Sequence, residues 1–114
     1  MFISSALALT AAPGLVVYGA TKAAIHSVAR SLRAELAGQV RVFDVLPPFV
    51  DTELAAGLGH NKLPARAVAR EIVSGFERDR LEIRIGRVSA LAVMTRVWPA
   101  AADRIVAREL AAPA

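Results

Sequence analysis

The chain contains a single tyrosine, Tyr18, and one of its two lysines, Lys22, follows it by four residues. In a helix this spacing places both side chains on the same face. An ammonium group beside a phenol favours the phenolate and lowers a pKa that starts near 10. Such a phenol could pass a proton to or from an alcohol or carbonyl oxygen. Alone the pair is a weak signal, because a tyrosine and a lysine on one helix turn usually just pack and meet solvent.

Two other segments carry groups that could meet the same ligand. Ser5 ends a short apolar segment, where its hydroxyl could donate to a substrate oxygen or simply satisfy nearby backbone groups. Pro47, Val50 and Thr52 follow a second apolar segment and could contact a flat, amide-bearing ligand, or form an ordinary turn. Ligands of open parallel sheets bind at the carboxyl ends of the strands, so both positions suit a binding site.

Strand-like and helix-like patterns alternate along the chain. Helical segments repeat apolar residues at steps of three and four, whereas the strand segments are rich in β-branched and aromatic residues or alternate apolar with charged ones. The expected elements are a strand at 2–5, a helix at about 17–36, a strand at 40–46, a helix beginning at Pro64, a strand at 81–85, and a last helix capped by Ser89 and divided at Pro99. This order predicts an α/β fold with a small parallel sheet covered on both faces.

Three segments carry a family resemblance. In order and spacing, Ser4-Ser5, Tyr18-Gly19-Ala20-Thr21-Lys22-Ala23-Ala24 and the turn from Pro47 to Thr52 resemble the short-chain dehydrogenase/reductase family. The Tyr-x-x-x-Lys motif followed by two alanines is fairly specific, and its combination with Ser5 and the turn is strong. The resemblance spans roughly the first half of the chain, and the remainder fits more loosely. It implies part of a Rossmann-like, doubly wound parallel sheet in the order strand-helix-strand-helix-strand-helix.

The resemblance also implies roles for individual residues. Tyr18 would be the general acid/base, Lys22 would lower the pKa of that phenol and hold the nicotinamide ribose, and Ser5 would orient the substrate. The residues implied to bind the cofactor are Tyr18, Lys22, Pro47, Val50 and Thr52. The implied reaction is hydride transfer between NAD or NADP and a small carbonyl or alcohol substrate, with the cofactor supplying the hydride chemistry.

One motif of the family is missing from these 114 residues. No Gly-x-x-x-Gly-x-Gly phosphate loop follows a strand, and Pro48 stands where the family usually has glycine. We therefore expect residues 1–114 to be the carboxyl-terminal catalytic portion of one Rossmann-like domain, without the amino-terminal half and inactive alone. Such a chain would form a homo-oligomer or pair with a complementing amino-terminal half. The alternative is a non-catalytic remnant that keeps the tyrosine helix as a dimerisation surface.

Composition excludes several other classes of protein. With 55% hydrophobic and 21% charged residues the chain is not intrinsically disordered, and without cysteine it has neither disulfides nor thiolate metal ligands. We expect no metal site, and we expect His26 to lie packed or on the surface of its helix. Of the 14 basic residues, those from Arg30 to Arg108 are scattered among acidic ones, so the net charge of +4 does not predict nucleic-acid binding.

The first 21 residues are uncharged, which is about the length of a bilayer span. However, no basic segment precedes them, and Pro13-Gly14 would interrupt a helix in their middle. We therefore expect these residues to be buried backbone and not a membrane span, with a signal peptide as the alternative, and we expect no membrane association and a cytoplasmic location.

Overall fold

The computed structural model describes residues 1–51 and 62–111. Its elements are β1 (Phe2–Ile3), the 3₁₀ helix η1 (Ala6–Ala8), α1 (Val16–Glu35), β2 (Asp44–Leu46), β3 (Val50–Asp51), β4 (Leu63–Pro64), α2 (Ala65–Glu77), β5 (Glu82–Arg84), α3 (Val88–Val97) and α4 (Pro99–Ala111). The alternation of strands and helices predicted from the sequence is therefore present.

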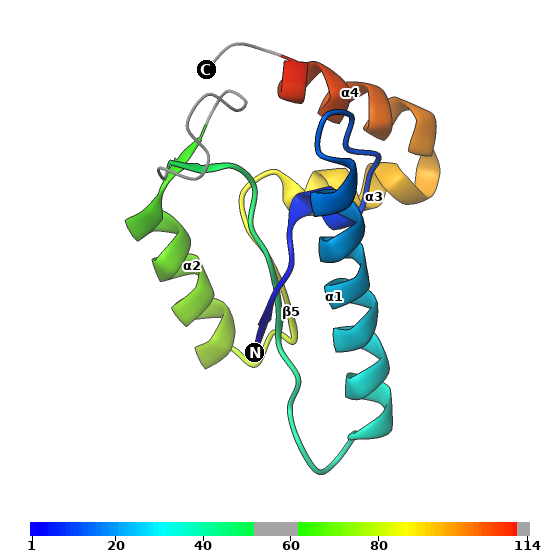
Figure 1. Ribbon diagram of the computed structural model, residues 1–114. Helices are drawn as coiled ribbons and strands as arrows, with labels where there is room; N and C mark the ends of the chain where they lie inside the picture. Colours follow the sequence, from blue (N-terminus) through cyan, green and yellow to red (C-terminus); the bar gives the residue numbers. More distant parts are fainter. Residues whose placement is uncertain (52–61, 112–114) are drawn as a thin grey trace.

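The main sheet has three parallel strands in the order β1-β2-β5, so β2 is central. Asp44 on β2 pairs in register with Phe2 on β1 and with Glu82 on β5. Helix α2 lies on one side of these strands and α1 on the other (Figure 1). The expected α/β fold with a parallel sheet is confirmed. A second sheet, in which β3 pairs in parallel with β4, was not expected from the sequence.

The face of the sheet toward α2 is apolar. Its core consists of Phe43, Val45, Val68, Ile83 and Ile85, and each of these side chains is buried. Helix α2 comes close to β5 at Gly75, where an added Cβ would lie only 2.8 Å from Ile83 Cγ1. Because successive side chains on a strand point to opposite faces, Asp44 and Glu82 face α1 instead.

Helices α3 and α4 form a corner beside the start of α1 (Figure 1). A second apolar cluster of Leu7, Ala12 and Val106 joins α4 to η1 and the loop that follows it. Pro99 divides the two helices as predicted. The predicted cap was wrong: α3 begins one residue before Ser89, and its N-cap residue is Arg87, which makes no side-chain capping bond.

The central strand is shorter than the pattern of residues 40–46 predicts. Pairing in the sheet begins only at Asp44, where β1 and β5 supply partners on both sides. Before that, Gly38 adopts φ +82° and the Val40 N–H still bonds to the Leu36 carbonyl, so this stretch forms the exit from α1. β-Branched residues favour an extended chain, but a strand exists only where a neighbour provides hydrogen bonds.

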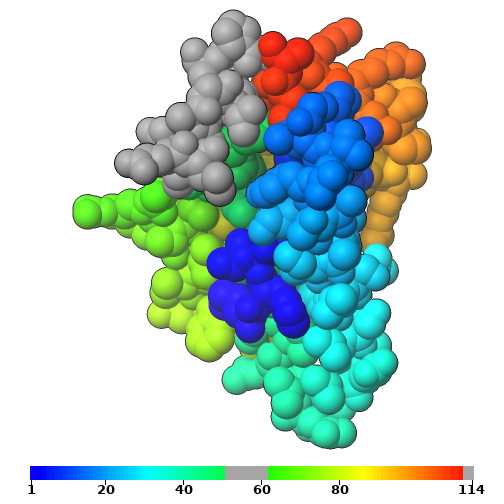
Figure 2. All heavy atoms as spheres, in the orientation of Figure 1, coloured from blue at the N-terminus to red at the C-terminus, as the bar shows by residue number. Residues whose placement is uncertain are grey.

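β1 lies at the edge of the three-stranded sheet. In the space-filling view the first residues are on the surface between α1 and α2 (Figure 2). Ile3 is about half exposed there. Among the described residues, no helix combines the length and the apolar character needed to cross a membrane.

Candidate active site

Tyr18 and Lys22 lie in the first two turns of α1, on the helix face predicted from their spacing. The Lys22 Nζ atom is 5.6 Å from the centre of the Tyr18 ring, within the range of a cation–π contact. The Tyr18 side chain is 41% exposed, so a ligand can reach the phenol. The structure thus places an ammonium group beside the single tyrosine of the chain.

Lys22 also connects α1 to the sheet. Its Nζ atom donates a hydrogen bond to the Ile3 carbonyl at 3.1 Å, at the end of β1. An ammonium group has three N–H donors, and this bond uses one of them. Lys22 is therefore fixed near the carboxyl end of β1 while it keeps donors for a ligand.

Ser5 is the second residue after β1 and is buried. Its Oγ atom accepts a hydrogen bond from the Leu7 N–H at 3.1 Å, so Ser5 caps η1. This is the local backbone role that was the alternative to substrate binding. In that bond the oxygen accepts, which leaves the hydroxyl hydrogen available to donate to a ligand. The two roles are therefore compatible.

Pro47 comes directly after β2 and lies beside the end of β1. Its carbonyl accepts a hydrogen bond from the Ala6 N–H at 3.0 Å, so the carboxyl ends of the two strands are adjacent. Val50 begins β3, and Thr52 lies outside the described residues. The structure thus brings Ser5, Lys22 and Pro47 to one edge of the sheet, whereas the assignment of catalytic and cofactor-binding roles stays a prediction.

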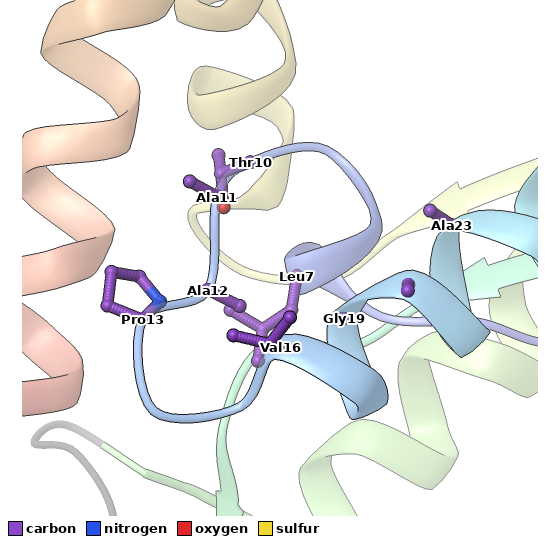
Figure 3. Close-up of a pocket in the computed structure, with 9 residues that line it drawn as sticks. Leu7, Thr10, Ala11, Ala12, Pro13, Val16, Gly19 and Ala23 are labelled. Carbon is purple, nitrogen blue, oxygen red and sulfur yellow. The ribbon is translucent and has the colours of Figure 1, made fainter.

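An apolar hollow of about 460 Å³ opens beside this region (Figure 3). Leu7, Ala12 and Val16 point into it, and Gly19 and Ala23 of α1 form one wall. At 100° per residue, these two positions lie on the face of α1 next to the one that carries Tyr18 and Lys22. Ser5, Tyr18 and Lys22 are not among the residues that line the hollow.

A buried polar network that was not predicted from the sequence lies on the α1 side of the sheet. The Ser4 hydroxyl donates to Asp44 Oδ1 at 2.8 Å, and His26 Nδ1 lies 2.6 Å from Asp44 Oδ2. His26 Nε2 lies 4.0 Å from a Glu82 oxygen, and Arg84 in turn holds Glu82. His26 is packed, as expected, but its partner was not anticipated. The sequence feature that could have indicated this network is Asp44, a single acidic residue within an otherwise apolar strand.

His26, Asp44 and Glu82 could each offer a ligand atom to a metal ion, and these atoms lie within 4.8 Å of one another. However, each carboxylate already has protein partners. Asp44 accepts from Ser4 and His26, and Glu82 accepts from Arg84. A cation would have to displace these contacts, so the arrangement fits a hydrogen-bond network better than a metal centre.

A small parallel sheet covered by helices, with candidate ligand-binding residues near the carboxyl ends of its strands, is the arrangement of a Rossmann-like protein. Residues 1–63 match the sequence profile described as short chain dehydrogenase. The chain belongs to the short-chain dehydrogenase family. This confirms the resemblance found in the sequence.

Individual relatives agree with this family. The chain is 44% identical over 61 residues, half of its length, to an uncharacterized oxidoreductase of Staphylococcus epidermidis, covering 26% of that protein. It is 33% identical over 101 residues to the uncharacterized oxidoreductase DltE of Bacillus subtilis, which corresponds to 82% of this chain and 40% of DltE.

A similar solved structure is that of a short chain dehydrogenase from Burkholderia cenocepacia in complex with NADP. The two share 28% sequence identity with a TM-score of 0.81, and the match covers 91% of this chain and 45% of that one. The chain therefore spans less than half the length of each of these three proteins.

Proposed function

We propose that the chain is the catalytic portion of an NAD(P)-dependent oxidoreductase that transfers a hydride between a nicotinamide and a carbonyl or alcohol substrate. The observation that carries this proposal is the Lys22 ammonium, which lies over the Tyr18 ring and bonds to the end of β1. Family membership and a similar structure crystallised with NADP support it. NAD and NADP are both compatible with the described residues.

The residues at this edge fit the nicotinamide end of such a cofactor. Lys22 keeps N–H donors for the ribose, and the backbone at Pro47 and Val50, with Thr52, would hold the carboxamide. The bound nicotinamide would accept or supply the hydride. In the direction of alcohol oxidation Tyr18 takes the hydroxyl proton, and in carbonyl reduction it returns a proton to the oxygen. Ser5 donates a hydrogen bond to the same oxygen.

The partners are also proposals. A small carbonyl or alcohol compound is the substrate, and the chain associates with a second copy or with an amino-terminal half that carries a phosphate-binding loop. Alone, the chain is expected to be inactive. A non-catalytic interaction module is the second candidate, because α1 also exposes Val17 and Val28 on its outer surface.

Cofactor binding distinguishes the two candidates. NADH and NADPH are titrated by fluorescence into the chain alone and after addition of a family amino-terminal half with its glycine-rich loop. We expect binding in the mixture and an affinity about 10- to 100-fold lower for Lys22→Met, because a hydrogen bond to a charged group is lost. Tyr18→Phe should still bind but should lose at least about 100-fold of any carbonyl reduction.

The exposed Arg41–Asp79 ion pair lies away from the candidate residues and provides the control. Arg41→Gln should leave cofactor binding unchanged. If neither nicotinamide binds in either preparation, the catalytic proposal is wrong and the interaction module is favoured.

A further inference from the structure

Helix α1 meets the sheet through polar side chains spaced along one face. Lys22 donates to the Ile3 carbonyl, His26 contacts Asp44, and Arg33 donates to the carbonyls of Val42 at 3.2 Å and Leu81 at 3.0 Å. An apolar helix face can shift slightly along a sheet at small cost, whereas hydrogen bonds of defined length and direction permit one position. These bonds therefore define where α1 lies.

Asp44 is at the centre of this interface. It is fully buried, its backbone N–H bonds to the Leu81 carbonyl at 2.8 Å, and β2 has a strand on each side. A buried carboxylate needs a partner for its oxygens, and here Ser4 serves one and His26 serves the other. Because a carboxylate can only accept, the His26 Nδ1–H is the donor. Loss of His26 would leave one buried oxygen without a partner.

The two partners of Asp44 adjoin the candidate catalytic residues. Ser4 directly precedes Ser5, and His26 lies one helix turn after Lys22 and two turns after Tyr18. Asp44 therefore joins the segment that carries the serine to the helix that carries the tyrosine and the lysine. The backbone at Ser4 is itself fixed, since its N–H bonds to the Val45 carbonyl at 2.9 Å.

We propose that His26 and Asp44 are positioning residues, whose contact sets where Tyr18 and Lys22 lie relative to Ser5. Their catalytic importance rests on the proposed function, but the structural coupling does not. Neither residue needs to touch the substrate or the cofactor. They act through the placement of α1 against β1 and β2.

The single tyrosine makes this coupling measurable. In protein labelled with ¹³C-tyrosine, the ring signals of the chain come from Tyr18 alone. His26→Leu removes the donor to Asp44 and should shift the Tyr18 ring signals and the Ser5 amide signal. His26→Asn should restore both toward their original positions, because the asparagine amide nitrogen can occupy the place of Nδ1. This readout requires neither cofactor nor substrate.

Arg33→Met is the matched control. It removes two hydrogen bonds between the same helix face and the sheet, but at the far end of α1 from Tyr18. It should lower the unfolding midpoint while leaving the Tyr18 signals in place. The proposal is overturned if His26→Leu leaves the Tyr18 and Ser5 signals in place, or if it shifts them no more than Arg33→Met does.

If His26→Leu does not fold, the variant Asp44→Asn, which changes the structure less, tests the same coupling. Asp44→Asn keeps the size of the side chain and an oxygen for Ser4, but it loses the charge that holds His26. Unchanged Tyr18 signals in Asp44→Asn would also overturn the proposal.

In the mixture with an amino-terminal half, where reduction is measurable, His26→Leu should lower turnover about 10- to 100-fold, and His26→Asn should recover it. Shifted signals without any cofactor binding would support the coupling and refute only the proposed function.

Discussion

Two adjacent serines show how the fold gives the same residue type different tasks. The Ser4 hydroxyl points to the α1 side of the sheet and donates to buried Asp44, whereas Ser5 accepts from a backbone N–H and caps η1. Neighbouring residues on an extended chain point to opposite sides, so the two hydroxyls cannot share one environment. Only the Ser5 bond leaves its hydrogen free for a ligand.

At the residue scale, Gly75 gives a stability prediction. Gly75→Ala should destabilise the fold by about 1–2 kcal/mol, because overpacking against buried Ile83 outweighs the helix propensity of about 1 kcal/mol that alanine adds. The new Cβ would lie within 3.0 Å of three Ile83 side-chain atoms, including both branches at its Cβ, so a simple rotation cannot clear them. Urea unfolding followed by circular dichroism measures the change.

Ile83→Ala provides the matched background for this test. It removes all three atoms that the alanine methyl would meet, so in this background Gly75→Ala should become stabilising. The same loss of stability in both backgrounds would show that the close contact between α2 and β5 is not its cause.

The candidate site was predictable where its residues are close in sequence. The four-residue spacing of Tyr18 and Lys22 fixes their shared helix face whatever the rest of the fold does. Ser5 and Pro47 were identified through the resemblance and the rule that ligands bind at strand ends. The contact between His26 and Asp44 was not predictable, because it joins residues 18 positions apart whose meeting depends on how α1 crosses β2.

At the scale of elements, the helices followed their apolar periodicity closely, and the strands did not follow their composition. Periodicity and Gly38 placed α1 to within about a residue at each end. The strands are short because a partner decides where pairing begins, as at Asp44. Pairing also produced β3 and β4, which no local pattern indicates.

Gly38 provides the prediction for α1. Its φ of +82° lies in the left-handed region, and no atom lies within 4 Å of an added Cβ. Gly38→Ala should therefore cost about 1 kcal/mol through backbone strain alone, and Gly38→Asn should cost less, since asparagine tolerates this conformation. Thermal unfolding measures both, and Gln39→Ala is the neighbouring control. Equal stability of the alanine and asparagine variants would show that the left-handed backbone conformation of Gly38 is not the cause of the destabilisation.

At the scale of the whole molecule, one side of α1 packs on the sheet and the other exposes apolar or small side chains. The exposed positions Val17, Thr21, Ala24 and Val28 follow one another at steps of four, three and four, so they form a stripe along the helix. A second exposed group, Val93, Val97 and Trp98, lies on α3 and at the corner before α4. Exposed apolar surface of this kind favours association.

We expect the chain to self-associate through the α1 stripe, because its small residues let a second helix approach closely along several turns. Val17→Glu combined with Val28→Glu should weaken self-association at least about tenfold in sedimentation velocity, since charges would be buried in the contact. Val93→Glu with Val97→Glu is the matched pair on α3 and should have little effect. The single tryptophan gives an independent check. Trp98 emission should stay constant as the protein is diluted, whereas a red shift on dilution would place the contact at the α3–α4 corner instead.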